Sequence, residues 1–134
     1  MIEGGAGVLY GTLSEGGLYG YGAIFKFDLN TSAFSLVYSF DGTNGGFPFA
    51  GLTRDHAGNF YGTTYEGGSG GVVFKLQADG TYTVLHYFSG GASGDGYAPY
   101  AGVIVDGQGN VYGTTEYGGN TSCNCGVVYE ISAQ

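Results

Sequence analysis

The sequence repeats itself with a period of 51 residues. The tripeptide Tyr-Gly-Thr occurs at residues 10–12, 61–63 and 112–114, each time 51 positions further along the chain. A Gly-Gly pair returns at the same interval, starting at residues 16, 67 and 118, and Pro48 and Pro99 are also 51 residues apart. One interval shared by unrelated residue types indicates tandem copies of a single structural unit. We therefore expect a single repeat array over residues 1–134, with copies at residues 4–49, 50–99 and 100–134.

Each copy has the composition of short β-strands. Glycine accounts for 30 of the 134 residues, aromatic residues for 16% and charged residues for only 10%. Glycine disfavours helices, whereas tyrosine, phenylalanine, valine and threonine favour strands. The second copy shows four strand-like runs separated by turn residues, at 50–54, 60–65, 72–76 and 82–88. The chain is predicted to be all-β.

Four short antiparallel strands in 51 residues match the size of a propeller blade. Such a sheet is apolar on both faces and must pack against neighbouring sheets. We expect a β-propeller-like array of four-stranded antiparallel blades, with an incomplete ring per chain. The opening strand of the first copy is expected to be missing or degenerate, because Gly4 stands where the second copy has the turn residue Asp55. The third copy ends before a fourth run, so its last strand is expected to be missing.

An open stack of sheets exposes apolar faces and strand edges, both of which favour association. The smallest common propellers have about four blades, which is more than three incomplete copies supply. The expected function is a non-enzymatic structural or interaction module that completes its blades by self-association. A homodimer that forms a six-bladed ring is the simplest arrangement.

The repeat resembles a known family. Its blocks are Ala-Gly-hydrophobic, Asp-x-x-Gly-Asn, aromatic-Tyr-Gly-Thr-Thr, Gly-Gly and Val-Phe-Lys-Leu, and the best copy spans residues 50–99. This order resembles the GloVer repeat, the Gloeobacter/Verrucomicrobia tandem repeat of bacterial surface and secreted proteins. The resemblance implies a propeller-like array, an extracellular or cell-surface location for the parent protein, and no catalytic residues. The chain shows no signal peptide, in contrast to that expectation.

The charge of the chain excludes some partners. Eleven acidic and three basic residues give a net charge of −8. Lysine and arginine are needed to neutralise phosphates, so nucleic acid and anionic membranes are poor partners. No apolar run is long enough to span a bilayer. We expect no nucleic acid, no membrane span and no cofactor.

The repeated tyrosines and threonines are the candidate ligand or interface residues. Tyrosine has a flat apolar face and a polar tip, which suit stacking on sugars or contact with a partner. This pattern supports a lectin-like, carbohydrate-binding propeller as the alternative function. The simpler interpretation is that the Tyr-Gly-Thr-Thr segment packs between blades, where glycine allows close approach. The residues concerned are Tyr10, Tyr61, Tyr112, Thr63 and Thr114.

Cys123 and Cys125 lie in a loop that is longer than its counterpart in the second copy. A zinc site would need two further ligands, and His56 and His86 are the only histidines. We therefore predict no metal. A disulfide across one residue, pairing with another chain and free thiols all remain open, and an exported protein favours oxidation.

The acidic residues give a third, weaker hypothesis. A glycoside hydrolase needs two carboxylates that flank one bond. Glu15 and Glu66 hold equivalent positions, however, so the repeat itself explains them, and we predict no catalytic residues. The loops at residues 41–46 and 93–96 offer oxygen ligands for calcium, but neither has the spacing of an EF-hand. We interpret both loops as turns.

Overall fold

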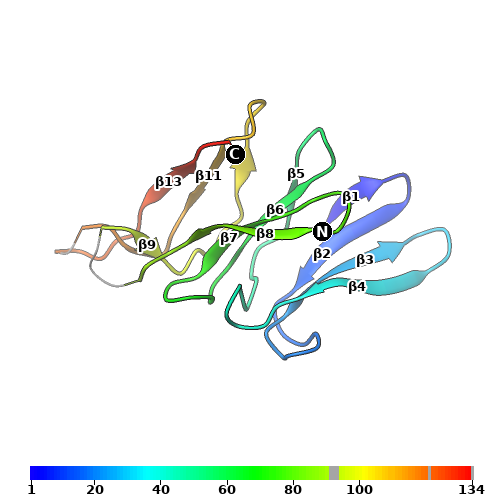
Figure 1. Cartoon of the computed structure of the whole chain (residues 1–134), viewed down its shortest axis with the longest axis horizontal. Coiled ribbons are helices and arrows are strands. Elements are labelled where there is room, and N and C mark those ends of the chain that lie inside the picture. Colours follow the sequence, from blue (N-terminus) through cyan, green and yellow to red (C-terminus); the bar gives the residue numbers. More distant parts are fainter. Residues whose placement is uncertain (91–93, 121, 134) are drawn as a thin grey trace.

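The structure is a computed structural model that describes residues 1–90, 94–120 and 122–133, and its regular elements are all β-strands. Two four-stranded antiparallel sheets and one three-stranded sheet lie in a row along the long axis of the molecule (Figure 1). The described strands form an open row rather than a closed ring. The first sheet contains β1 (Ile2–Gly5), β2 (Val8–Leu13), β3 (Ala23–Asp28) and β4 (Ala33–Ser39).

The second and third sheets follow the same sequential order. The second sheet contains β5 (Thr53–Arg54), β6 (Phe60–Thr64), β7 (Val72–Leu76) and β8 (Tyr82–Tyr87). The third contains β10 (Ile104–Val105), β11 (Val111–Thr114) and β13 (Val128–Ile131). A two-stranded sheet pairs β9 (Gly96–Tyr97) with β12 (Tyr117–Gly118).

The opening strand of the first copy, expected to be missing or degenerate, is present as β1. β1 pairs with β2, with Ile2 opposite Tyr10 and Gly5 opposite Val8, and the register shifts between Glu3 and Gly5. No aspartate is needed because the connection is a tight glycine turn, in which Gly7 has a φ of 75°. The strand therefore begins before residue 4, where the repeat was expected to start.

The repeats share fine detail as well as topology. In the first sheet, the register between β3 and β4 shifts between Ile24 and Phe25. In the second sheet, the register between β7 and β8 shifts between Val73 and Phe74, the equivalent positions. A β-bulge at one site in successive copies increases the local twist of both sheets in the same way.

The hydrophobic core lies between the sheets rather than within any one of them. Phe40 of the first sheet contacts Phe74 of the second, with ring centroids 5.5 Å apart. The same pair recurs one interface later as Phe88 and Tyr129, at 5.1 Å. Each interface buries a separate cluster of apolar side chains. The stability of a sheet in this array therefore depends on its neighbours.

The hydroxyl of Tyr129 is the exception in this packing. Its oxygen is buried, and no group in the described residues forms a hydrogen bond with it. Phe74 occupies the equivalent position, so the hydroxyl adds a polar group to a site built for a phenyl ring. Burial also raises the pKa of Tyr129.

We expect Tyr129→Phe to increase the free energy of unfolding by about 1 kcal/mol, because it removes an unsatisfied buried hydroxyl. Urea denaturation measures the change. Tyr82→Phe is the matched control, since the Tyr82 hydroxyl donates to the Asn44 carbonyl oxygen at 2.6 Å and its removal should destabilise the protein. A loss of stability in both variants would contradict the conclusion that the buried Tyr129 hydroxyl is unsatisfied.

Candidate interaction surfaces

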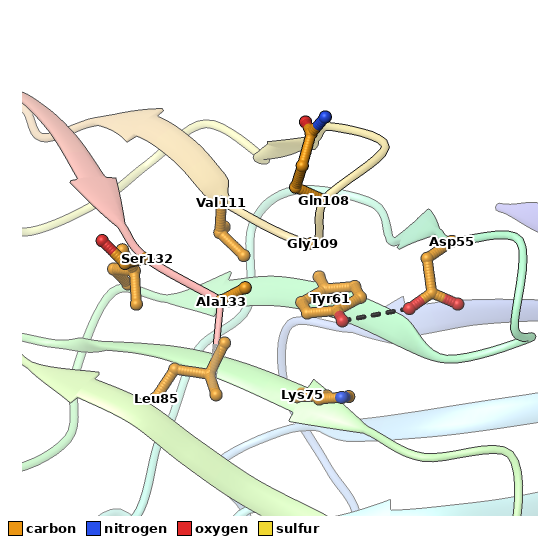
Figure 2. Close-up of a pocket in the computed structure, with 10 residues that line it drawn as sticks. Asp55, Tyr61, Lys75, Leu85, Gln108, Gly109, Val111, Ser132 and Ala133 are labelled. Atoms are coloured by element: carbon orange, nitrogen blue, oxygen red, sulfur yellow. Dashed lines mark hydrogen bonds between the residues drawn. The ribbon is translucent and has the colours of Figure 1, made fainter.

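The turn between the first two strands of the second sheet is organised by Asp55. Its Oδ1 accepts hydrogen bonds from the backbone N–H groups of Ala57 and Asn59, both at 2.9 Å. Its Oδ2 accepts from Asn59 Nδ2 at 2.9 Å and from the Tyr61 hydroxyl at 3.0 Å, a contact visible in Figure 2. The Tyr61 hydroxyl therefore serves the fold of its own repeat.

The third sheet repeats this arrangement around Asp106. The carboxylate accepts from the backbone N–H groups of Gln108 and Asn110, both at 2.9 Å, and from Asn110 Nδ2 at 2.8 Å. The Tyr112 hydroxyl donates to Asp106 Oδ2 at 3.0 Å. The Asp-x-x-Gly-Asn-x-Tyr sequence is thus a self-contained structural motif.

These contacts shift the pKa values of the participating groups. Burial acts to raise the pKa of Asp55, but the hydrogen bonds from Asn59, Tyr61 and Ala57 outweigh it, and the net pKa is lowered. The side-chain hydrogen bond from Asn110 is the main cause of the lowered pKa of Asp106. Burial, followed by the hydrogen bond to Asp55, raises the pKa of Tyr61 to about 12.

The lowered carboxyl pKa values predict loss of stability in acid. A carboxyl whose folded pKa lies below its ordinary value of 3.8 stabilises the fold above that pH, and the contribution is lost as pH falls through the folded pKa. We expect the thermal midpoint to fall steeply below about pH 4. The double variant Asp55→Asn/Asp106→Asn should be less stable at neutral pH and show a flatter acid limb, whereas the exposed control Glu15→Gln should keep the slope. An unchanged acid limb in the double variant would show that other groups set it.

The three candidate tyrosines do not converge on one site. Each lies on the second strand of its own sheet. Tyr10 stacks on Phe60 of the neighbouring sheet, with ring centroids 4.4 Å apart, and Tyr61 is buried against the third sheet. Tyr112 is the equivalent residue on the outer face of the third sheet. The structure therefore places Tyr10 and Tyr61 at successive interfaces between sheets, and Tyr112 at the end of the row.

Of the two candidate threonines, Thr63 lies at an interface between sheets and Thr114 does not. The Thr12 hydroxyl donates to the Ala50 carbonyl oxygen at 2.8 Å, and the Thr63 hydroxyl donates to the Ala101 carbonyl oxygen at 2.9 Å. Both bonds link a second strand to the start of the following copy. Thr114, the third member of the series, is exposed. Thr12 and Thr63 each help to form an interface with the following copy, whereas no described sheet covers Thr114.

A cleft of about 190 Å³ lies between the second and third sheets (Figure 2). The cleft exists because Val111 is smaller than Phe60, its equivalent in the second sheet. Between the first and second sheets, the Phe60 ring fills the corresponding space by stacking on Tyr10. The Asp55 carboxylate in the cleft is already engaged by the turn, and Lys75 Nζ lies 5.6 Å from the centre of the Tyr61 ring. The smaller side chain of Val111 therefore accounts for the cleft.

Cys123 and Cys125 are joined in a disulfide. Between them, the side-chain oxygen of Asn124 accepts from the Gly118 backbone N–H at 2.8 Å, and its Nδ2 donates to the Tyr97 hydroxyl at 3.1 Å. The loop therefore fastens the two-stranded sheet of β9 and β12, which explains its extra length. Among the described residues, no three histidine, cysteine or acidic side chains are grouped as metal ligands would be.

The remaining candidates are separate surface features. Asp41 accepts from the backbone N–H groups of Thr43 and Asn44, at 2.9 and 2.7 Å, as in a plain turn. Ser93, which begins the second loop considered for calcium, lies outside the described residues. Glu15 and Glu66 are exposed.

Sequence reasoning missed a cluster of surface aromatic rings. Phe49 stacks on Tyr100 with ring centroids 5.0 Å apart, and Tyr65 lies edge-on to both rings. The rings of Phe49 and Tyr100 are exposed. The signal was present, because these two residues are also 51 positions apart and each follows a proline.

Taken together, the sheets and their interfaces define an all-β tandem-repeat protein. The family model described as the Gloeobacter/Verrucomicrobia repeat matches residues 1–134, and the chain belongs to this family. No curated protein sequence matches the chain. Within the part of the chain that the structure describes, no helix is long and apolar enough to cross a membrane.

Proposed function

We propose that this chain is a non-enzymatic structural and interaction module whose open blade faces dock head to tail on a second copy. The observation that carries the proposal is a comparison of three equivalent residues. Ile24 and Val73 are 0% exposed because the following sheet covers them, whereas Val128 is 83% exposed on the third sheet. The sheet face that the following sheet covers in the first two sheets is therefore uncovered in the third sheet.

The opposite end of the row has the complementary face. Leu52 and Val103 are 7% and 4% exposed beneath the preceding sheet, whereas Met1, at the equivalent position, is 76% exposed. Phe34 and Leu36 are exposed on the same outer face of the first sheet. Within the chain, the face of Ile24 packs against the face of Leu52. A second copy can therefore repeat this contact by placing its first sheet on the third sheet of its partner.

Head-to-tail docking of two copies would give each copy two interfaces and could close a propeller-like ring of six blades. Closed rings remove the open faces that would otherwise lead to filaments. The net charge of −8 on each copy opposes association, so added salt should strengthen it. By analogy with the family resemblance, we place the parent protein outside the cell or on its surface.

The test uses one substitution on each face. Val128→Asp blocks the outer face of the third sheet, and Phe34→Asp blocks the outer face of the first sheet. We expect the unaltered chain to have the mass of a dimer by light scattering, and each variant alone to be a monomer. Leu18→Asp is the control, because Leu18 is an exposed apolar residue in the turn after β2 and lies on neither face.

Mixing the two variants distinguishes head-to-tail docking from other contacts. Each variant keeps one intact face, and the two intact faces are complementary, so the mixture should recover a heterodimer. If the unaltered chain stays monomeric at every concentration and salt level, or the mixture fails to associate while the wild type does, head-to-tail docking is wrong.

A second candidate function, carbohydrate binding, is favoured by the exposed rings of Phe49 and Tyr100. Exposed aromatic faces at one rim suit stacking on sugar rings. Glycan-array binding that is lost in Tyr100→Ala, but kept in Tyr61→Phe, would support this function. Absence of binding to any glycan would exclude it for the glycans tested.

A further inference from the structure

The edge of the third sheet differs from the corresponding edges of the other two. In the first and second sheets the third strand, β3 or β7, is flanked on both sides. Within the described residues, β13 pairs with β11 alone, through Val111 opposite Ile131 and Thr114 opposite Val128. Its other edge therefore has the position that β4 and β8 fill elsewhere. An open strand edge is a template for β-augmentation.

The pairing of β7 with β8 shows which side chains such a strand would need. Tyr82 lies opposite Leu76, and Val84 lies opposite Phe74. The equivalents of Leu76 and Phe74 on β13 are Ile131 and Tyr129. An added antiparallel strand should therefore place an aromatic residue opposite Ile131 and an aliphatic residue two positions later.

The neighbouring sheet also offers a contact for that aromatic residue. Tyr82 stacks on Tyr38 of the preceding sheet, with ring centroids 3.8 Å apart and ring planes 9° apart. His86 holds the position of Tyr38 one repeat later, and its side chain is 39% exposed. Its ring is fixed edge-on against Phe88 at 4.7 Å. The incoming aromatic ring would cover His86 as Tyr82 covers Tyr38.

We propose that the edge of β13 that no described strand pairs with is a β-augmentation site for an extended segment of a partner polypeptide, in which aromatic and aliphatic residues alternate with polar ones. The site comprises the β13 edge together with the His86 ring of β8, which lies edge-on against the buried ring of Phe88. Main-chain hydrogen bonds supply affinity and the alternation supplies specificity. This site goes beyond the docking of sheet faces, because it concerns an edge and needs only a single strand.

The probe is a labelled peptide with the sequence of residues 80–90, which contains β8. It is titrated by fluorescence polarisation into the Phe34→Asp variant, in which head-to-tail docking is blocked but the β13 edge is unaltered. We expect saturable binding, and at least tenfold weaker binding of a peptide in which neighbouring residues at positions 82–89 are exchanged in pairs. The exchanged peptide has the same composition, but in the same register it places a threonine instead of a tyrosine at the position opposite Ile131.

Hydrogen exchange locates the bound peptide. We expect slower exchange of amides within residues 128–131 at saturation, and no change in β4 of the first sheet. Equal binding of the two peptides, protection only at sites other than β13, or no binding to a folded variant would each overturn the proposal. Because docking of faces is blocked in this variant, none of these outcomes depends on whether the chain dimerises.

Discussion

Phe74→Ala is expected to destabilise the protein by about 3–5 kcal/mol, as removal of a fully buried phenyl ring does in a core that cannot collapse. The ring is 0% exposed and contacts Phe40 at 5.5 Å and Tyr82 at 5.4 Å between centroids. It also lies over Gly62, whose missing side chain leaves room for it. Urea denaturation followed by tyrosine fluorescence would measure the loss of free energy of unfolding.

The repeat supplies a matched control for this substitution. Phe25 occupies the same position in the first sheet, but its face is the open one, where its ring contacts Phe34 at 5.5 Å. We expect Phe25→Ala to cost no more than about 1–2 kcal/mol at low protein concentration, because less apolar surface is buried there. An equal loss in the two variants would show that burial between sheets is not the main source of stability.

The period was sufficient to predict the four strands of the second sheet, because successive copies repeat the same strand and turn chemistry. The four runs of the second copy correspond to β5, β6, β7 and β8. The opening strand of the first copy was missed because its turn uses Gly7 instead of an aspartate motif. The small sheet of β9 and β12 was missed for another reason: its two-residue strands come from connecting loops and have no alternation to detect.

The candidate site was less predictable than the fold. Alternation shows which strand residues share a face, but coverage of that face depends on the next sheet. The sequence therefore left Tyr61 as either a ligand or an interface residue, whereas the structure shows that the third sheet buries it and that its hydroxyl donates to Asp55. Phe49 and Tyr100 were overlooked because their exposure follows from the positions of the loops around them. Equivalent residues of the three copies distinguish interface positions from open ones only when their burial in the structure is compared.

Comparison of the three copies also identifies a backbone position that requires glycine. Gly71 precedes β7 and has a φ of 94°, a conformation that L-residues rarely adopt. A Cβ atom there would lie 2.6 Å from the Thr64 carbonyl oxygen, 2.7 Å from Pro99 Cδ and 2.8 Å from the Tyr65 carbonyl oxygen. Gly22 and Gly126 hold the equivalent positions in the other copies, with φ values of 94° and 88°.

We expect Gly71→Ala to destabilise the protein by more than about 3 kcal/mol, because strain at positive φ adds to collisions with a backbone that cannot move away. Thermal and urea denaturation measure the effect, and soluble yield reports it if the variant fails to fold. Gly80→Ala is the matched control: Gly80 has a φ of 92°, but a Cβ there meets no atom within 4 Å. Its cost should be limited to strain, about 1–2 kcal/mol. Similar losses in the two variants would mean that dihedral strain alone explains the glycine, and that the close approach of Pro99 from the next repeat contributes little.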